Sequence, residues 1–551
     1  MSRKFGIRRS VLGYNPNHFE LQFVAIFRSP IMKQESILRS STLFSLATLA
    51  SRISGLIRDS CIAATIPAAW QDIFWAGIKI PSTFRELFAE GALSAAFIPL
   101  LTRVREREGE SKAREVGHAI FNLLLLVVTG VVLVAILLAP WYVPLILNFP
   151  YDPATAWKVP AGIETTQMMF PFLIFIALSA WAMGILNTYR HFFMPAAASI
   201  FFNLSLIVGG LIGPRYFTGM RLMAFMAAAV VIGGFLQFAV QLPQARKIQF
   251  FPPPNRSIFN PWVKEFLLLL APSTFGLAIY QINALITQTY FASSFGLGGI
   301  SIMQYAFRLM QFPLGVVGMA ISTASFPRIA QLFEQNKREE VAGTIAYVIK
   351  HLMLLMIPAS IGLVVMGEDI VGLIYDRKEF HRAGWLHPTY IVLVGYSLGL
   401  FFYSFARVMV RSFQAHHDFK TPVRNGVVSM FINISLCTLF VNYFHFGLWS
   451  LAVASTLAST YQGVVLMGIL KRRIKELRLT PLLTFLIPIL LASVGMGLAC
   501  YDFLAVFPLP PGTFIHYLIR VVFGMLVGLL AYGAFGWLLF RAELKAVLRL
   551  E

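Results

Sequence analysis

Residues 121–141 read FNLLLLVVTGVVLVAILLAPW, a stretch without one charged side chain. A helix of about 20 apolar residues crosses a hydrocarbon core about 30 Å thick. A second stretch of this kind, FGMLVGLLAYGAFGWLLF, begins at Phe523. The whole chain of 551 residues is 57% hydrophobic and only 13% charged. Because a soluble chain of this length needs far more polar surface, the sequence predicts an all-α polytopic membrane protein.

Apolar blocks along the chain predict about fourteen transmembrane helices. They are expected at residues 37–66, 72–101, 117–146, 162–188, 192–213, 221–243, 262–292, 299–327, 341–366, 387–412, 422–444, 448–470, 479–503 and 514–541. Arg and Lys concentrate in the loops after the second, sixth, eighth, tenth and twelfth helices. The positive-inside rule then places both termini on the cytoplasmic side of an inner membrane. The formal charge of +20 is therefore a topology signal and does not indicate nucleic acid.

Two basic connections divide the predicted helices into groups of six, six and two. The first is QARKIQFFPPPNRSIFNPWVKE over residues 244–265, and the second is KRRIKELR, which follows the twelfth helix. The predicted parts are a cytoplasmic N-terminal extension (1–36), a first lobe (37–243), a cytoplasmic linker (244–261), a second lobe (262–470) and a C-terminal part (471–551) with two helices and a cytoplasmic end.

Charged residues interrupt three of the predicted helices. They are Arg52, Arg58 and Asp59 in the first helix, Asp72, Lys79, Arg85, Glu86 and Glu90 in the second, and Arg308 in the eighth. Each ionisable group near the bilayer centre costs roughly 2.5–3.5 kcal/mol, so these side chains are expected to face a wet interior or one another. Asp72 is expected at the outer rim, which leaves the interior net positive. Because arginine suits bidentate phosphate recognition, the pattern indicates an anionic, phosphate-bearing ligand. The alternative is that Arg–Asp and Arg–Glu pairs only pin helices together.

Several motifs resemble the MurJ/MviN family of lipid II flippases. They are ASRISGLIRD (50–59), KIPSTFRELFAEGALSAAFIPLL (79–101), LNTYRHFFMPA (186–196), YAFRLMQFPLGVVGMAISTASFPRIA (305–330) and DFKTPVRN (418–425). The resemblance implies two six-helix lobes around a central cationic cavity, plus two C-terminal helices, as in the multidrug/oligosaccharidyl-lipid/polysaccharide exporter superfamily. It also implies a role in peptidoglycan biosynthesis. The cargo would be lipid II, the undecaprenyl-pyrophosphate-linked precursor, carried to the periplasmic leaflet by alternating access.

The resemblance assigns substrate binding to the four intramembrane arginines, Arg52, Arg58, Arg85 and Arg308. Supporting roles are expected for Asp59, Asp72, Lys79, Glu86, Glu90 and Ser51. Glycines and prolines are expected to act as hinges, namely Gly55, Pro81, Pro313 and Gly315. Phe307 and Gln311 flank Arg308 where acids are common in the family, so its ion-pair partner is either missing or supplied elsewhere.

No cofactor is expected, and the three separated cysteines form no metal motif. Asn283 and Asn433 are weak candidates for a sodium site, with helix packing as the other interpretation. Coupling to a cation or to the membrane potential is a further expectation. The expected partners are lipid II, membrane lipids and cell-wall synthesis proteins.

Two other functions remain open from the sequence. One is export of another polyprenyl-pyrophosphate-linked glycan by the same fold. The other is a polyprenyl-phosphate glycosyltransferase, which needs catalytic acids or metal ligands at a membrane face. The best candidates, Asp376, Glu379, His381 and Asp418, form no paired-carboxylate or metal-spacing motif. The chain is therefore expected not to be an enzyme.

Overall fold

The computed structural model describes most of the chain as helices. The described residues are 46–87, 92–153, 155–250, 260–506, 508 and 513–541. The predicted N-terminal extension and Glu90 lie outside these residues. Within these described residues, each of the fourteen predicted spans coincides with one helix or with consecutive helices of the structure.

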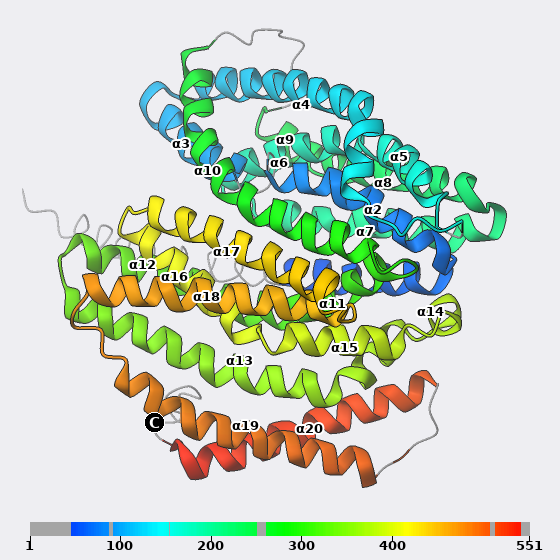
Figure 1. Cartoon of the computed structure of the whole chain (residues 1–551). Helices are drawn as coiled ribbons and strands as arrows, with labels where there is room; N and C mark the ends of the chain where they lie inside the picture. The colour runs from blue at the N-terminus through cyan, green and yellow to red at the C-terminus, as the bar shows by residue number, and fades with distance from the viewer. Residues whose placement is uncertain are drawn as a thin grey trace, which may run out of the picture.

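The first lobe lies at the top of Figure 1. Its helices are the segment 46–65, α2 (Ala68–Arg85), α3 (Ala92–Glu108), α4 (Glu110–Ile146), α5 (Lys158–Met169), α6 (Phe172–Thr188), α7 (Phe193–Tyr216), α8 (Gly219–Ala239) and α9 (Leu242–Lys247). The predicted fourth span is split into α5 and α6 next to Pro171, which cannot donate a helical hydrogen bond. Trp181 lies in the core of this lobe and donates from Nε1 to the carbonyl of Gly117 on α4 at 2.8 Å.

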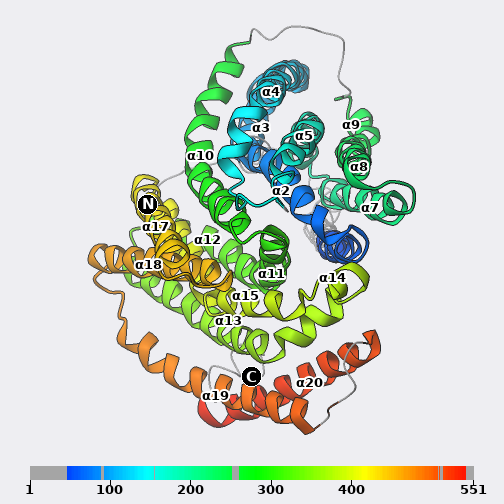
Figure 2. The same cartoon turned by 45° about the vertical axis from the view of Figure 1, so that its right-hand side comes forward.

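The second lobe follows in the middle of Figure 1. Its helices are α10 (Pro261–Leu285), η2 (Ile286–Phe291), α11 (Gly299–Pro313), η3 (Leu314–Gly318), α12 (Met319–Glu334), α13 (Arg338–Tyr375), α14 (Lys378–Arg382), α15 (Leu386–Ser397), α16 (Leu400–Ala415), α17 (Lys420–Thr438), η4 (Leu439–Tyr443) and α18 (Trp449–Arg473). Asn260 caps α10 by accepting from the Trp262 amide at 3.0 Å. Helix α10 packs along α3 as well as α17, so it joins the two lobes (Figure 2).

The last two helices, α19 (Thr480–Val506) and α20 (Phe514–Leu539), form a hairpin that packs on α13, at the bottom of Figure 1. Arg520 of α20 makes a two-pronged ion pair with Asp369 of α13. Its Nε lies 2.8 Å from Oδ1 and its Nη2 lies 3.1 Å from Oδ2. The Tyr517 hydroxyl donates to Asp376 at 3.0 Å. These bonds fasten one end of the hairpin to the second lobe.

Long apolar helices identify a multi-pass membrane protein. Among the described residues, nine helices are long and apolar enough to cross a membrane, or ten if the bent pair α15–α16 forms one span. Leu145 of α4 is 74% exposed, and Leu530 and Leu538 of α20 are 75% and 78% exposed. Side chains of this kind facing outward from long apolar helices fit a hydrocarbon environment.

Among the described residues, π-helical turns include η2, η3 and η4, and η3 falls at a predicted hinge. Pro313 ends α11, and Gly315 lies in η3. In contrast, the segment 46–65 remains helical through Gly55, and α2 remains helical through Pro81. π-Turns are frequent at functional sites, because the extra residue re-aims the side chains that follow it.

Candidate functional site

The two lobes share one buried carboxylate, that of Asp59. Arg58, its neighbour in the segment 46–65, places Nη2 2.6 Å from Oδ1. Arg308 of α11, in the second lobe, donates from Nε to Oδ2 at 2.7 Å. The partner that Phe307 and Gln311 do not provide for Arg308 is therefore supplied by the opposite lobe.

Asn203 of α7 positions Arg58 and was not predicted from the sequence. Its Oδ1 accepts from Arg58 Nη1 at 2.9 Å. Its Nδ2 donates to Ser54 Oγ at 2.9 Å and to the Ser51 carbonyl at 3.2 Å. Ser51, a predicted supporting residue, thus contributes its backbone oxygen. The available signal was a buried amide within an apolar helix, since such a group needs hydrogen-bond partners.

Arg52 lies against the second lobe at Gly315. A Cβ added to Gly315 would meet Arg52 Nη1 at 2.0 Å. The missing side chain therefore makes room for the guanidinium group. Gly315 acts here as a close-contact position on the π-turn, in addition to its place at a helix irregularity.

Lys79, Arg85 and Glu86 of α2 continue this polar region. We call the region made of Arg52, Arg58, Asp59, Lys79, Arg85, Glu86 and Arg308 the seam. Arg85 Nη2 lies 3.5 Å from Glu86 Oε1, and Glu86 also accepts from Gln281 of α10. The Arg308 and Arg85 side chains are 33% and 23% exposed, so the seam is not closed to water. Lys79 is half-buried on the same helix. The seam contains more cations than acids. Its cations are Arg52, Arg58, Lys79, Arg85 and Arg308, and its acids are Asp59 and Glu86.

Asp72 is fully buried near the start of α2. It accepts from Lys158 Nζ at 2.8 Å within the first lobe. From the second lobe it accepts from the Gly298 amide at 2.7 Å, the Ser301 amide at 3.0 Å and the Ser301 hydroxyl at 2.8 Å. The carboxylate thus caps the N-terminus of α11, where exposed amides favour a negative charge.

Gly298 makes this cap possible. Its φ is +87°, and an added Cβ would lie 2.7 Å from the Trp385 ring. Only glycine adopts that backbone readily and fits that space. Lys158, the other partner of Asp72, was not predicted from the sequence.

Further contacts join the two lobes near Asp72. We call this end of the seam the Asp72 end. The Tyr305 hydroxyl of α11 donates to Gln71 and accepts from Trp75 Nε1 at 3.2 Å, and both partners lie on α2. The Tyr305 ring also packs on Phe380 of α14, with ring centroids 5.7 Å apart. At the opposite end, Arg103 of α3 pairs with Glu265 of α10.

The two sodium candidates bond to each other inside the second lobe. Asn433 Nδ2 donates to Asn283 Oδ1 at 2.9 Å and to Thr287 Oγ1 at 2.7 Å. The oxygens that a cation needs are thus occupied by an amide donor, and the set is neutral. Within the described residues, no group of three or more His, Cys, Asp or Glu side chains is placed to hold a metal. These residues do not fit a sodium site as they stand.

The fold is similar to that of solved membrane transporters. A solved inward-facing MATE family transporter of the MOP superfamily superposes with a TM-score of 0.63 at 16% identity, over 80% of this chain and 96% of that chain. More narrowly, residues 64–522 match the family described as "Lipid II flippase MurJ". The chain therefore belongs to the MurJ family.

Individual relatives agree with this assignment. A probable lipid II flippase MurJ of Rhizobium meliloti is 32% identical over 84% of this chain and 86% of its own length. One from Bdellovibrio bacteriovorus is 29% identical over 86% and 89%, respectively. A solved structure of a lipid II flippase MurJ in an inward closed conformation has a TM-score of 0.74 at 24% identity, over 91% of this chain and all of that chain.

Proposed function

We propose that this protein flips lipid II from the cytoplasmic to the periplasmic leaflet of the bacterial inner membrane, and that it is a transporter without catalytic activity of its own. The observation that carries the proposal is the seam. Guanidinium groups from both lobes converge on one shared carboxylate, so most of the positive charge is left for a ligand. A diphosphate matches that charge and the fork geometry of arginine.

Asp59 gives the seam a way to respond to the ligand. It now holds Arg58 and Arg308 together across the lobes. A diphosphate that competes for these guanidinium groups weakens the link between the lobes. Binding of cargo and opening of the Asp72 end are then coupled, as alternating access requires.

The orientation of the chain is part of the proposal. Basic residues follow the ends of α3, α9, α12, α16 and α18, and the positive-inside rule places such ends in the cytoplasm. The Asp72 end then faces the periplasm and is closed. With a net positive seam, the membrane potential biases the return of the empty carrier by about 2.3 kcal/mol per charge per 100 mV.

The test is transport of labelled lipid II in cells depleted of their own flippase. The wild-type chain should restore flipping, and Arg52→Ala and Arg308→Ala should abolish it while still inserting in the membrane. Arg308→Lys, which keeps the charge but loses the fork, should remain impaired. Arg382→Ala is the matched control, because this side chain is 76% exposed and lies outside the seam.

Two outcomes oppose the proposal. Normal flipping by both alanine variants rejects the role of the seam. If the wild-type chain moves another polyprenyl-linked glycan but not lipid II, the assignment of lipid II as cargo is wrong and the assignment as a carrier remains.

A further inference from the structure

A small pocket lies at one end of the second lobe, away from the seam. Its volume is about 60 Å³, and it is lined by the C-terminal ends of α12, α16 and α18 and by the start of α13. A single water needs about 10–15 Å³ on this measure, so the pocket has room for a group of several heavy atoms. All four helices belong to the second lobe, so the pocket does not depend on how the lobes are arranged.

The pocket combines an apolar floor with a polar rim. The floor is made of buried side chains, namely Leu332, Val341, Leu470 and Ile474. The rim includes His416, whose ring stacks on Phe333 with centroids 4.7 Å apart. Asn336, also on the rim, has a φ of +55°, a conformation that Asn tolerates better than most residues. The rim is thus held in a defined shape.

Positive charge on the rim is not balanced by acids of the lining. Among the described lining residues there are Lys337, Arg338 and Arg473, and no Asp or Glu. Two of these cations already have partners. Lys337 Nζ lies 2.8 Å from Glu340, and Arg473 Nη1 lies 2.7 Å from Asp418.

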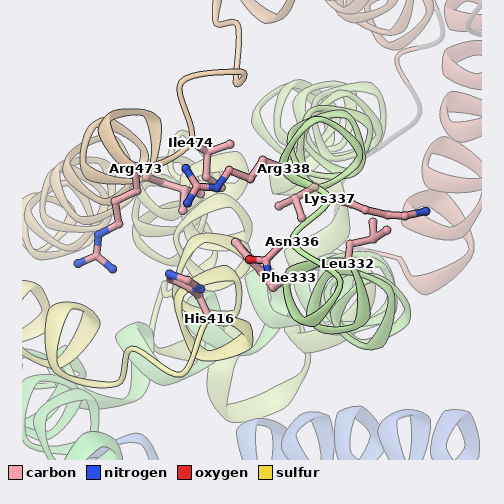
Figure 3. A pocket seen from close by; sticks show the side chains of 10 residues that line it. Leu332, Phe333, Asn336, Lys337, Arg338, His416, Arg473 and Ile474 are labelled. Atoms are coloured by element: carbon pink, nitrogen blue, oxygen red, sulfur yellow. The ribbon is translucent and has the colours of Figure 1, made fainter.

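Arg338 differs from its neighbours in direction. In Figure 3 its guanidinium group extends across the pocket toward Ile474, whereas the ammonium of Lys337 points the opposite way. The Arg473 guanidinium also points away from the centre, toward the Asp418 side. The nearby acid Glu334 is engaged by His417 at 3.0 Å. The fork of Arg338 is therefore the charged group presented to a ligand.

We propose that this pocket binds a phosphate group, with Arg338 as its principal ligand and with the His416 ring and the side-chain amide of Asn336 completing the site. Arginine recognises phosphate through two parallel hydrogen bonds. Basic pockets between transmembrane helices at the membrane surface bind lipid headgroups. Two of the lining helices, α13 and α18, are long and apolar enough to cross a membrane. The phosphate belongs either to an anionic phospholipid of the adjoining leaflet or to a free anion in solution.

The experiment measures binding to the purified full-length chain in a neutral detergent by native mass spectrometry. The probes are dioctanoyl phosphatidylglycerol, dioctanoyl phosphatidylcholine and inorganic phosphate. The wild-type chain should bind the glycerol lipid more tightly than the choline lipid. Arg338→Gln should weaken this binding at least about tenfold, the loss expected for one hydrogen bond between charged groups. Lys337→Gln removes the same charge one residue away and should change binding less than about twofold.

The outcomes separate the two sources of phosphate. Binding of inorganic phosphate with the same dependence on Arg338 supports the site and assigns it a soluble ligand. Equal binding of both lipids together with no Arg338-dependent binding of inorganic phosphate, or equal losses in the two glutamine variants, overturns the proposal. Because Arg338 and Lys337 are surface residues, unchanged melting temperatures in both variants will show that the fold is intact.

Discussion

Asp72→Asn is the perturbation with the clearest expected consequence. The substitution keeps the size of the side chain but removes the negative charge that Lys158 faces. The Lys158 side chain is 1% exposed, and its other close partner is the ring of Phe149, with Nζ 4.7 Å from the centroid. The ammonium is then left buried without a counter-charge.

The magnitude follows from this burial. Removing one partner of a buried ion pair costs about 3–5 kcal/mol. Lys158→Met should lie toward the lower end of that range, because Asp72 keeps its three hydrogen bonds from Gly298 and Ser301. The double variant leaves no unpaired charge. It should therefore cost less than the sum of the two single variants, by about 2 kcal/mol or more.

The assay is denaturant unfolding of the purified wild-type chain, the two single variants and the double variant. Ser301→Ala is the matched control, since it removes one hydrogen bond to Asp72 and leaves the ion pair in place. If the costs of the single variants add within about 0.5 kcal/mol, Asp72 and Lys158 are not coupled and the description of this cap is wrong.

Two other predictions concern different parts of the chain. Gly315→Ala should displace the flexible end of Arg52 and lower lipid II transport at least about tenfold, with little change in melting temperature, and normal transport would show that the contact is dispensable. At Asp418, burial acts to raise the pKa, but hydrogen bonds from Thr421 and the charge of Arg473 outweigh it and hold the pKa at about 2, below the ordinary 3.8. Because the folded-state pKa is depressed, this stabilisation is present above pH 4 and is lost as the pH falls toward 2. Arg473→Gln should therefore lose less stability than the wild type over that interval, and equal losses measured by thermal unfolding would contradict this account.

The helices could be predicted from the sequence because lipid imposes a simple rule. A spanning segment must be apolar over about 20 residues, and the described residues of every predicted block correspond to helix. Departures from regular helix were harder to predict. The π-turn at η3 requires one extra residue in a turn, and periodicity alone does not reveal it.

The candidate site was predictable in its charges but not in its pairings. Intramembrane arginines stand out because they are costly in lipid. The sharing of Asp59 by Arg58 and Arg308 depends on two segments about 250 positions apart, which no local pattern connects. Lys158 was missed for the same reason, because its partner Asp72 lies on another helix.

The attachment of the α19–α20 hairpin has a practical consequence. Its packing on α13, reinforced by Arg520 and Asp369, ties it to the second lobe. A spin label on α20 is therefore expected to move together with that lobe. Distances from α20 to α13 are then expected to stay constant, whereas distances from α20 to α7 would report the relative motion of the lobes that the proposed alternating access requires. Any long-chain molecule bound along the hairpin would likewise move together with the second lobe.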